Sequence, residues 1–325
     1  MFHDLILPDT RPCEWAEIRA RIRARILDSF GTAPIPVEPV RTPFEITGEY
    51  TRFGLRHLVI RYHVLEDFWN EAILVLPEDI STPVPAVLTL HGTNPIGKAS
   101  LMELEKRPRR AYPIELAGRG LATISPDQYG FGSTVAGTTG TALTEEFYRR
   151  WPDWSIVAIR VLANLRAADV LDQLDYIRHD GYGAMGNSTG GQSTLFLAAM
   201  DERITASVPS CGISPNLTNV YRYIKKGRDG DPALADLIEK DGRMPWDLQE
   251  MIALIAPRAM LALEPFNDPF NPYTEATVGC VMKAAKVWGL LGAQEKIALH
   301  LHGDGHDTID DVRNLAYDWL ERFLK

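Results

Sequence analysis

The chain has 325 residues, of which 45% are hydrophobic and 24% charged, a composition that suits one large folded domain rather than a disordered chain. Its formal net charge of −9 argues against nucleic acid or an anionic membrane as the main partner. The N-terminal stretch carries an early aspartate and no long apolar run, so we expect no signal peptide, no membrane span and a cytoplasmic protein. The oligomeric state is left open by the sequence.

The three cysteines are Cys13, Cys211 and Cys280, and they show neither metal-ligand spacing nor a paired framework. We therefore expect buried free thiols. No histidines and carboxylates have the spacing of a metal site, and no glycine-rich phosphate or dinucleotide fingerprint is present. The sequence thus predicts neither a metal nor a cofactor.

Residues 1–44 are predicted to form a helix and an extended connector in front of the main domain, 45–325. Apolar residues recur every three or four positions over 14–30, and Gly31 then provides a helix stop. The segment 32–43 carries four prolines, which is typical of an extended connector.

Strand patterns begin with two runs, 56–64 and 71–77, which predict an antiparallel start to a sheet. A mostly apolar strand at 85–91 is expected to be covered on both faces. Strands and helices then alternate, which predicts an α/β fold with a mostly parallel central sheet and helices on both faces. The later strands are expected at 121–126, 182–185, 204–210, 259–264 and 297–302, and the helices at 112–118, 156–177, 189–200, 274–291 and 308–324.

An insertion at about 213–255 follows one of these strands, and we interpret it as a helical cap over the site. It contains Trp246, and Tyr129 lies in the loop after the strand at 121–126. Both aromatic residues are predicted to bind substrate. The alternative for such residues is a place in the hydrophobic core.

Ser188 lies in Gly186-Asn187-Ser188-Thr189-Gly190, a G-x-S-x-G pattern between a predicted strand and a predicted helix. In this context a serine occupies a strained turn with its hydroxyl exposed, and glycines on either side let the strand and helix pack closely. An oxyanion that forms beside Ser188 would meet the N–H of Thr189 at the helix N-terminus. We predict that Ser188 is a nucleophile; the alternative is an ordinary turn of small residues.

The segments 186–191, 198–204 and 255–258 together resemble the α/β-hydrolase superfamily, in its dienelactone-hydrolase and acetyl-xylan-esterase-like branch. The resemblance covers most of the chain from about residue 45 onward. It implies an α/β-hydrolase fold with the chain order nucleophile, acid, histidine. Dienelactone hydrolases proper typically use cysteine where this chain has Ser188.

A serine hydroxyl needs a base to take its proton, and an acid to orient that base. The resemblance places the base in the loop after the last strand, which gives His306. His300 and His302 alternate within that strand and are expected to pack or to face solvent. Asp268, before a proline, resembles the family's acid, and Glu264 at the end of the preceding strand is its rival.

The loop after the strand at 85–91 begins His91-Gly92-Thr93-Asn94, and a His-Gly pair there matches the superfamily. We expect the N–H of Thr93 to complete an oxyanion hole with that of Thr189, with Gly92 or Asn94 as alternatives. His91 itself is expected to be structural.

These residues predict a serine hydrolase that cleaves a small-molecule carboxylic ester through an acyl-enzyme, with Ser188, His306 and Asp268 as the triad. The resemblance implies an acetylated carbohydrate or another small ester. An amidase or peptidase with the same triad is the alternative enzyme. A catalytically silent binding protein on the same fold is the alternative of another class.

Overall fold

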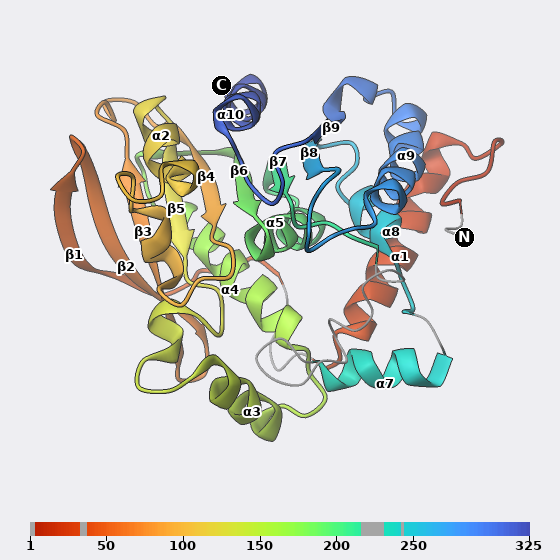
Figure 1. Ribbon diagram of the computed structural model, residues 1–325, viewed down its shortest axis with the longest axis horizontal. Coiled ribbons are helices and arrows are strands. Elements are labelled where there is room, and N and C mark those ends of the chain that lie inside the picture. Colours follow the sequence, from red (N-terminus) through yellow and green to blue (C-terminus); the bar gives the residue numbers. More distant parts are fainter. Residues whose placement is uncertain (1–3, 33–37, 216–230, 242–243) are drawn as a thin grey trace.

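The computed structural model describes residues 4–32, 38–215, 231–241 and 244–325. In these residues the strands form one nine-stranded sheet in the order β1-β2-β3-β5-β4-β6-β7-β8-β9 (Figure 1). The pairs from β5 and β4 through to β9 are parallel, which confirms the predicted mostly parallel sheet. The strands are β1 (Phe44–Arg52), β2 (Leu55–Leu65), β3 (Phe68–Leu76), β4 (Val84–Leu90), β5 (Ala122–Pro126), β6 (Ile177–Asn187), β7 (Ile204–Ser210), β8 (Ala259–Pro265) and β9 (Ile297–His302).

Helices cover both faces of this sheet, with α2 (Tyr112–Gly118) and α10 (Asp310–Leu324) on one side and α4 (Ile156–Leu171) and α5 (Thr189–Met200) on the other (Figure 1). Alternate residues of each strand supply the two hydrophobic cores, because successive side chains point to opposite faces. The remaining helices that are described are α1 (Trp15–Ser29), α3 (Gly140–Arg150), α7 (Pro232–Asp241), α8 (Leu248–Ala253) and α9 (Thr274–Leu290).

The antiparallel start of the sheet was predicted only in part. β2 and β3 pair as expected, with Leu58 opposite Leu74. The prediction did not include β1, which pairs with β2 at the edge of the sheet. Phe44, Ile46 and Tyr50 alternate with polar residues along it, although its side chains are half-buried or exposed throughout.

The predicted helix at 156–177 is wrong at its C-terminal end. α4 stops at Leu171, and Ile177 already belongs to β6, where it pairs with Val84 of β4. Almost every residue of α4 is buried, so no amphipathic pattern marks where the helix ends. Its buried charges are paired: Arg166 Nη1 lies 2.8 Å from Asp169 Oδ2.

The N-terminal helix is confirmed as α1, and its apolar stripe, including Trp15, Ile22 and Ile26, is buried in the core. The expectation of three buried thiols is wrong for Cys13, which is exposed just before that helix, whereas Cys211 and Cys280 are buried. Among the helices of the described residues, none combines the length and the apolar character needed to cross a membrane.

The predicted cap at 213–255 is described only in part, since 216–230 and 242–243 lie outside the described residues. Within the described part, α8 packs against α5 and α9, and all of its residues are buried. α8 therefore belongs to the helical layer of the domain, and the interpretation of the whole insertion as a cap stays a prediction.

Trp246 precedes α8 and lies in the hydrophobic core, with 4% of its surface exposed. Its ring packs edge-on against Phe30 and Phe196, at centroid distances of 6.2 Å and 5.9 Å. Its indole Nε1 donates a hydrogen bond of 2.6 Å to Ser29 Oγ. These contacts join the end of α1 to the α5 layer, so the structure places Trp246 in the core and not on a surface open to substrate.

We expect Trp246→Ala to lower the free energy of unfolding by about 3–5 kcal/mol, because it leaves a large cavity in this core. Trp69→Ala, at a half-buried position of β3, serves as the matched control and should cost less. Chemical denaturation measures both losses. An unchanged stability together with an altered preference between short and long esters would instead support a role for Trp246 in substrate binding.

Candidate active site

Ser188 occupies a sharp turn between β6 and α5, with φ +61° and ψ −123°. A residue other than glycine at positive φ is strained by roughly 1–3 kcal/mol and needs surrounding structure to hold it. That support comes from β7, since the Ser188 N–H donates a 2.8 Å hydrogen bond to Ser210 O. At Gly190, an added Cβ would lie 2.0 Å from Leu90 O, so only glycine lets α5 start this close to β4.

His306 and Asp268 come from the loops after β9 and β8, the neighbouring strands at one edge of the sheet. His306 Nδ1 lies 2.7 Å from Asp268 Oδ2. The other carboxylate oxygen of Asp268 accepts backbone N–H bonds from Phe270 at 2.7 Å and Asn271 at 3.3 Å. A histidine engaged through Nδ1 is fixed in orientation and keeps Nε2 available for proton transfer.

Glu264, the alternative candidate for the triad acid, is engaged by the backbone after β7. It is 1% exposed, and its Oε1 accepts weak hydrogen bonds from the backbone N–H groups of Gly212 at 3.3 Å and Ile213 at 3.4 Å. Burial raises the pKa of Glu264 well above the usual range of a glutamate, which favours the neutral acid. The structure therefore brings Asp268, and not Glu264, to His306.

Hydrogen bonds join the His306 loop to two other parts of the chain. Arg110, in a short 3-10 helix, donates from Nη2 to His306 O at 3.2 Å and from Nη1 to Thr308 Oγ1 at 2.8 Å. Asn267 donates to Gly303 O at 2.7 Å and accepts from the Gly305 N–H at 2.9 Å. These bonds fix the position of the imidazole relative to β8.

The loop after β4 reaches the turn at Ser188. Thr93 Oγ1 lies 2.8 Å from Thr189 Oγ1, so the two residues predicted for the oxyanion hole are neighbours. A Cβ added to Gly92 would lie 3.4 Å from Ser188 Cβ and 2.9 Å from Asn187 O. Which N–H of this loop would meet an oxyanion stays a prediction.

His91, which opens this loop, is fully buried and uses both ring nitrogens. Its Nε2 accepts a 2.9 Å hydrogen bond from the Gln128 N–H, so the proton sits on Nδ1, which donates to Gly92 O at 2.7 Å. Burial lowers the pKa of His91, in keeping with a neutral ring. This environment fits the structural role predicted for His91.

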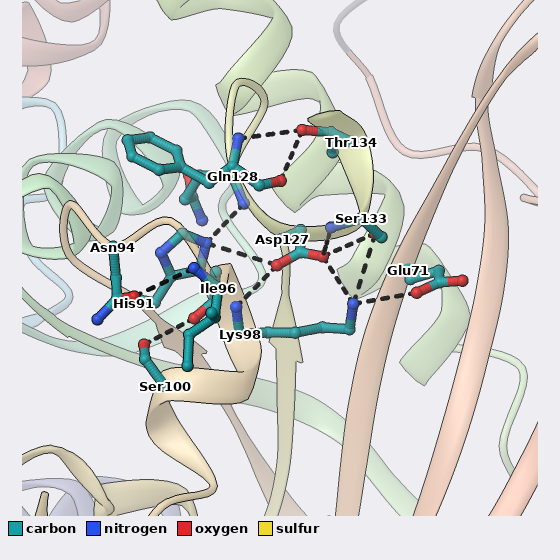
Figure 2. A network of polar contacts seen from close by, with 12 residues as sticks. Glu71, His91, Asn94, Ile96, Lys98, Ser100, Asp127, Gln128, Ser133 and Thr134 are labelled. Carbon is teal, nitrogen blue, oxygen red and sulfur yellow. Dashed lines mark hydrogen bonds and ion pairs between the residues drawn. The ribbon is translucent and has the colours of Figure 1, made fainter. Parts of the chain in front are cut away.

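A buried carboxylate, Asp127, holds the β4 loop against the loop after β5 (Figure 2). It accepts from Lys98 Nζ at 2.6 Å, from the Lys98 N–H at 2.7 Å, and from the N–H and hydroxyl of Ser133 at 2.8 Å and 2.7 Å. Lys98 Nζ also reaches Glu71 Oε2 of β3 at 3.1 Å. These bonds hold the two loops together.

Tyr129, predicted to bind substrate, is 6% exposed and packs edge-to-face against Phe68 and Phe147, at 5.2 Å and 5.7 Å between ring centroids. Burial raises the pKa of its phenol to about 12. The structure thus places Tyr129, like Trp246, in the core, which is the alternative that the sequence left open for both.

Cys211 is a neighbour of the histidine and its acid that the sequence did not single out. In the described part of the chain, a thiol, a carboxylate and an imidazole atom of Cys211, Asp268 and His306 lie within 4.8 Å of one another. Burial raises the pKa of the Cys211 thiol to about 12, so the thiol keeps its proton near neutral pH. Its only sequence signal is its position directly after β7, where ligand sites of parallel sheets gather.

No family model matches the chain. Among curated proteins, "Putative hydrolase YtaP" of Bacillus subtilis (strain 168) is 25% identical over 267 residues, which span 78% of this chain and 83% of that protein. A glucuronoyl esterase from Solibacter usitatus superposes with a TM-score of 0.75 at 16% identity, covering 99% of this chain and 97% of that one. A protein of Bacteroides fragilis NCTC 9343, named a "putative acetyl xylan esterase", superposes with a TM-score of 0.70 at 15% identity, covering 91% and 77%.

The chain therefore has the α/β-hydrolase fold, as the resemblance of its motifs implied. Its structural neighbours include carbohydrate esterases, and its curated relative bears the name of a hydrolase.

Replacing Lys98 by methionine should destabilise the protein by about 3–5 kcal/mol, because Asp127 would stay buried without its cation. Lys106→Met removes a lysine whose ion pair with Glu103 is largely exposed, and should cost less than about 1 kcal/mol. Denaturant unfolding of the two variants tests the difference. Equal and small losses would show that the Lys98–Asp127 pair does not hold the loops.

Asp268→Asn should reduce kcat by about 10²- to 10⁴-fold, since the amide favours the wrong tautomer of His306. Glu264→Gln keeps the shape of a side chain that already favours its neutral form, so kcat should fall at most about tenfold. Steady-state kinetics on a p-nitrophenyl ester measures both. A severe defect in Glu264→Gln with a mild one in Asp268→Asn would transfer the role of the acid to Glu264.

Proposed function

We propose that the chain is a serine esterase with Ser188, His306 and Asp268 as its catalytic triad. The observation that carries the proposal is the 2.7 Å contact of His306 Nδ1 with Asp268 Oδ2. Ser188, Asp268 and His306 each follow one of the parallel strands β6, β8 and β9, and the carboxyl ends of parallel strands meet at one edge of the sheet. The positive φ of Ser188 fits the strained turn in which a nucleophilic serine of this fold holds its hydroxyl exposed.

The reaction then follows from the roles of these groups. His306 Nε2 takes the proton of Ser188 as Oγ attacks the ester carbonyl, and Asp268 holds the imidazole in place. The N–H groups of Thr93 and Thr189 stabilise the negative charge on the carbonyl oxygen. His306 returns the proton to the departing alcohol, and a water molecule, activated by His306, releases the acid from Ser188.

For the substrate, we propose an ester of a carbohydrate, an acetyl ester among them, or another small ester. The support is the set of structural neighbours, which are named glucuronoyl esterases and a putative acetyl xylan esterase. Because fold alone does not give substrate, p-nitrophenyl esters of graded acyl length beside a panel of acetylated sugars are the experiment that would identify it.

Ser188→Ala should lower kcat by about 10⁴-fold or more while the fold survives, because no nucleophile remains. The variant should also lose labelling by a fluorophosphonate probe. Ser193→Ala, one turn further along α5, is the matched control and should keep both turnover and labelling. Near-normal turnover in a folded Ser188→Ala protein would refute the proposed nucleophile.

A further inference from the structure

Exposed aromatic residues gather in the segment that carries the proposed acid. Phe266 and Phe270 are each 66% exposed and Tyr273 is 46% exposed, whereas Asp268 between them is 3% exposed. Single exposed apolar side chains are ordinary on a protein surface. Here three exposed aromatic rings flank one buried carboxylate in the chain, and exposed apolar surface next to a proposed catalytic group is typical of a binding surface.

Two of these rings are held in place against the His306 loop. The Phe270 ring lies edge-to-face on the His306 imidazole, with centroids 4.7 Å apart and an angle of 67°. The Phe266 ring lies over Gly303, where an added Cβ would come within 3.0 Å of Phe266 Cζ. A glycine at 303 thus leaves room for the Phe266 ring.

The backbone of the segment is fixed as well. The Phe266 N–H donates to His302 O at 3.0 Å, and the Phe270 N–H donates to Asp268 Oδ1 at 2.7 Å. Thr274 Oγ1 closes the segment with a 3.0 Å bond to Pro265 O. The rings therefore stay exposed although their backbone is well anchored, which favours a preorganised surface over a loop that has failed to pack.

The position of Phe270 beside His306 indicates which half of the substrate it would meet. In ester cleavage the histidine gives its proton to the oxygen of the departing alcohol, so that oxygen lies next to the imidazole. The carbon skeleton attached to it must extend past the residues around His306. Phe270 is in contact with the imidazole, whereas the acyl carbon is bound at Ser188.

We propose that Phe270, together with Phe266, which lies against the same His306 loop, forms a binding subsite for the alcohol half of the ester, and that this alcohol carries a ring with an apolar face. The inference rests on the proposed serine esterase function. An aromatic ring and the apolar face of a pyranose both stack on phenylalanine, so they share the chemistry that the subsite recognises.

The test compares three acetate esters that share the acyl group: ethyl acetate, benzyl acetate and 6-O-acetylglucose. Phe270→Ala should lower kcat/KM for at least one ring-bearing ester, relative to ethyl acetate, by about tenfold, since ring-on-ring contact and apolar area are both lost. Phe270→Trp keeps an aromatic face and should largely preserve the ratio. Leu315→Ala, at an exposed position of α10, is the surface control and should change no ratio.

A selective loss with benzyl acetate identifies an aromatic alcohol as the ligand, and a selective loss with the acetylated sugar identifies a pyranose; either supports the subsite. Equal losses with all three esters would make Phe270 a positioning residue for His306 and overturn the subsite. Unchanged ratios in both Phe270→Ala and Phe266→Ala would overturn it too. Because Ser188→Ala and fluorophosphonate labelling test the nucleophile independently, the esterase function could stand when the subsite fails.

Discussion

The constraint on which the site depends is the backbone conformation of Ser188. A positive φ at a serine is unfavourable on its own, and here it is held from two sides. Ser210 O of β7 accepts a hydrogen bond from the Ser188 N–H. On the other side, β4 approaches α5 so closely that Gly190 cannot carry a side chain. The parallel pairing of β4, β6 and β7 thus maintains the strained conformation of Ser188. The large buried core on both faces of the sheet offsets the free-energy cost of this strain.

The other groups of the site depend on contacts between loops that are far apart in the sequence. Arg110 binds the backbone at His306, Asn267 binds Gly303 and Gly305, and Asp127 joins the β4 loop to the loop after β5. Each of these contacts holds a segment that carries a proposed catalytic or oxyanion group. Preorganisation of this kind lets donors point at developing charge without rearrangement during the reaction.

The sequence predicted the parts of the molecule whose pattern is local. The strands at Ile204–Ser210 and Ile297–His302 and the helix Tyr112–Gly118 were placed at their observed boundaries, because apolar runs and turns mark them. The G-x-S-x-G pattern located the turn at Ser188 for the same reason. The end of α4 was missed because that helix is buried on all sides. β1 was not predicted although Phe44, Ile46 and Tyr50 alternate with polar residues, since this edge strand buries few apolar side chains.

The roles of the aromatic residues could not be read from the sequence, because they depend on tertiary packing. Trp246 and Tyr129 were predicted to bind substrate, but they lie in the core. Phe266 and Phe270 were not predicted as site residues, and both are exposed beside the loop of His306. Composition cannot separate these cases, since an aromatic ring fits a core and a binding surface equally well. The solvent exposure of each ring in the folded chain separates the two cases.

Two carboxyl groups near the end of β8 show how environment assigns different roles to similar chemistry. Glu264 is enclosed at the end of the strand, where burial raises its pKa and favours the uncharged form. Asp268, four residues on, faces His306 and accepts two backbone N–H bonds. A second negative charge beside Asp268 would repel it in a medium of low dielectric constant. A neutral Glu264 avoids that repulsion and leaves Asp268 as the carboxylate that orients the histidine, which is the division between acids expected where neighbouring groups differ in exposure and partners.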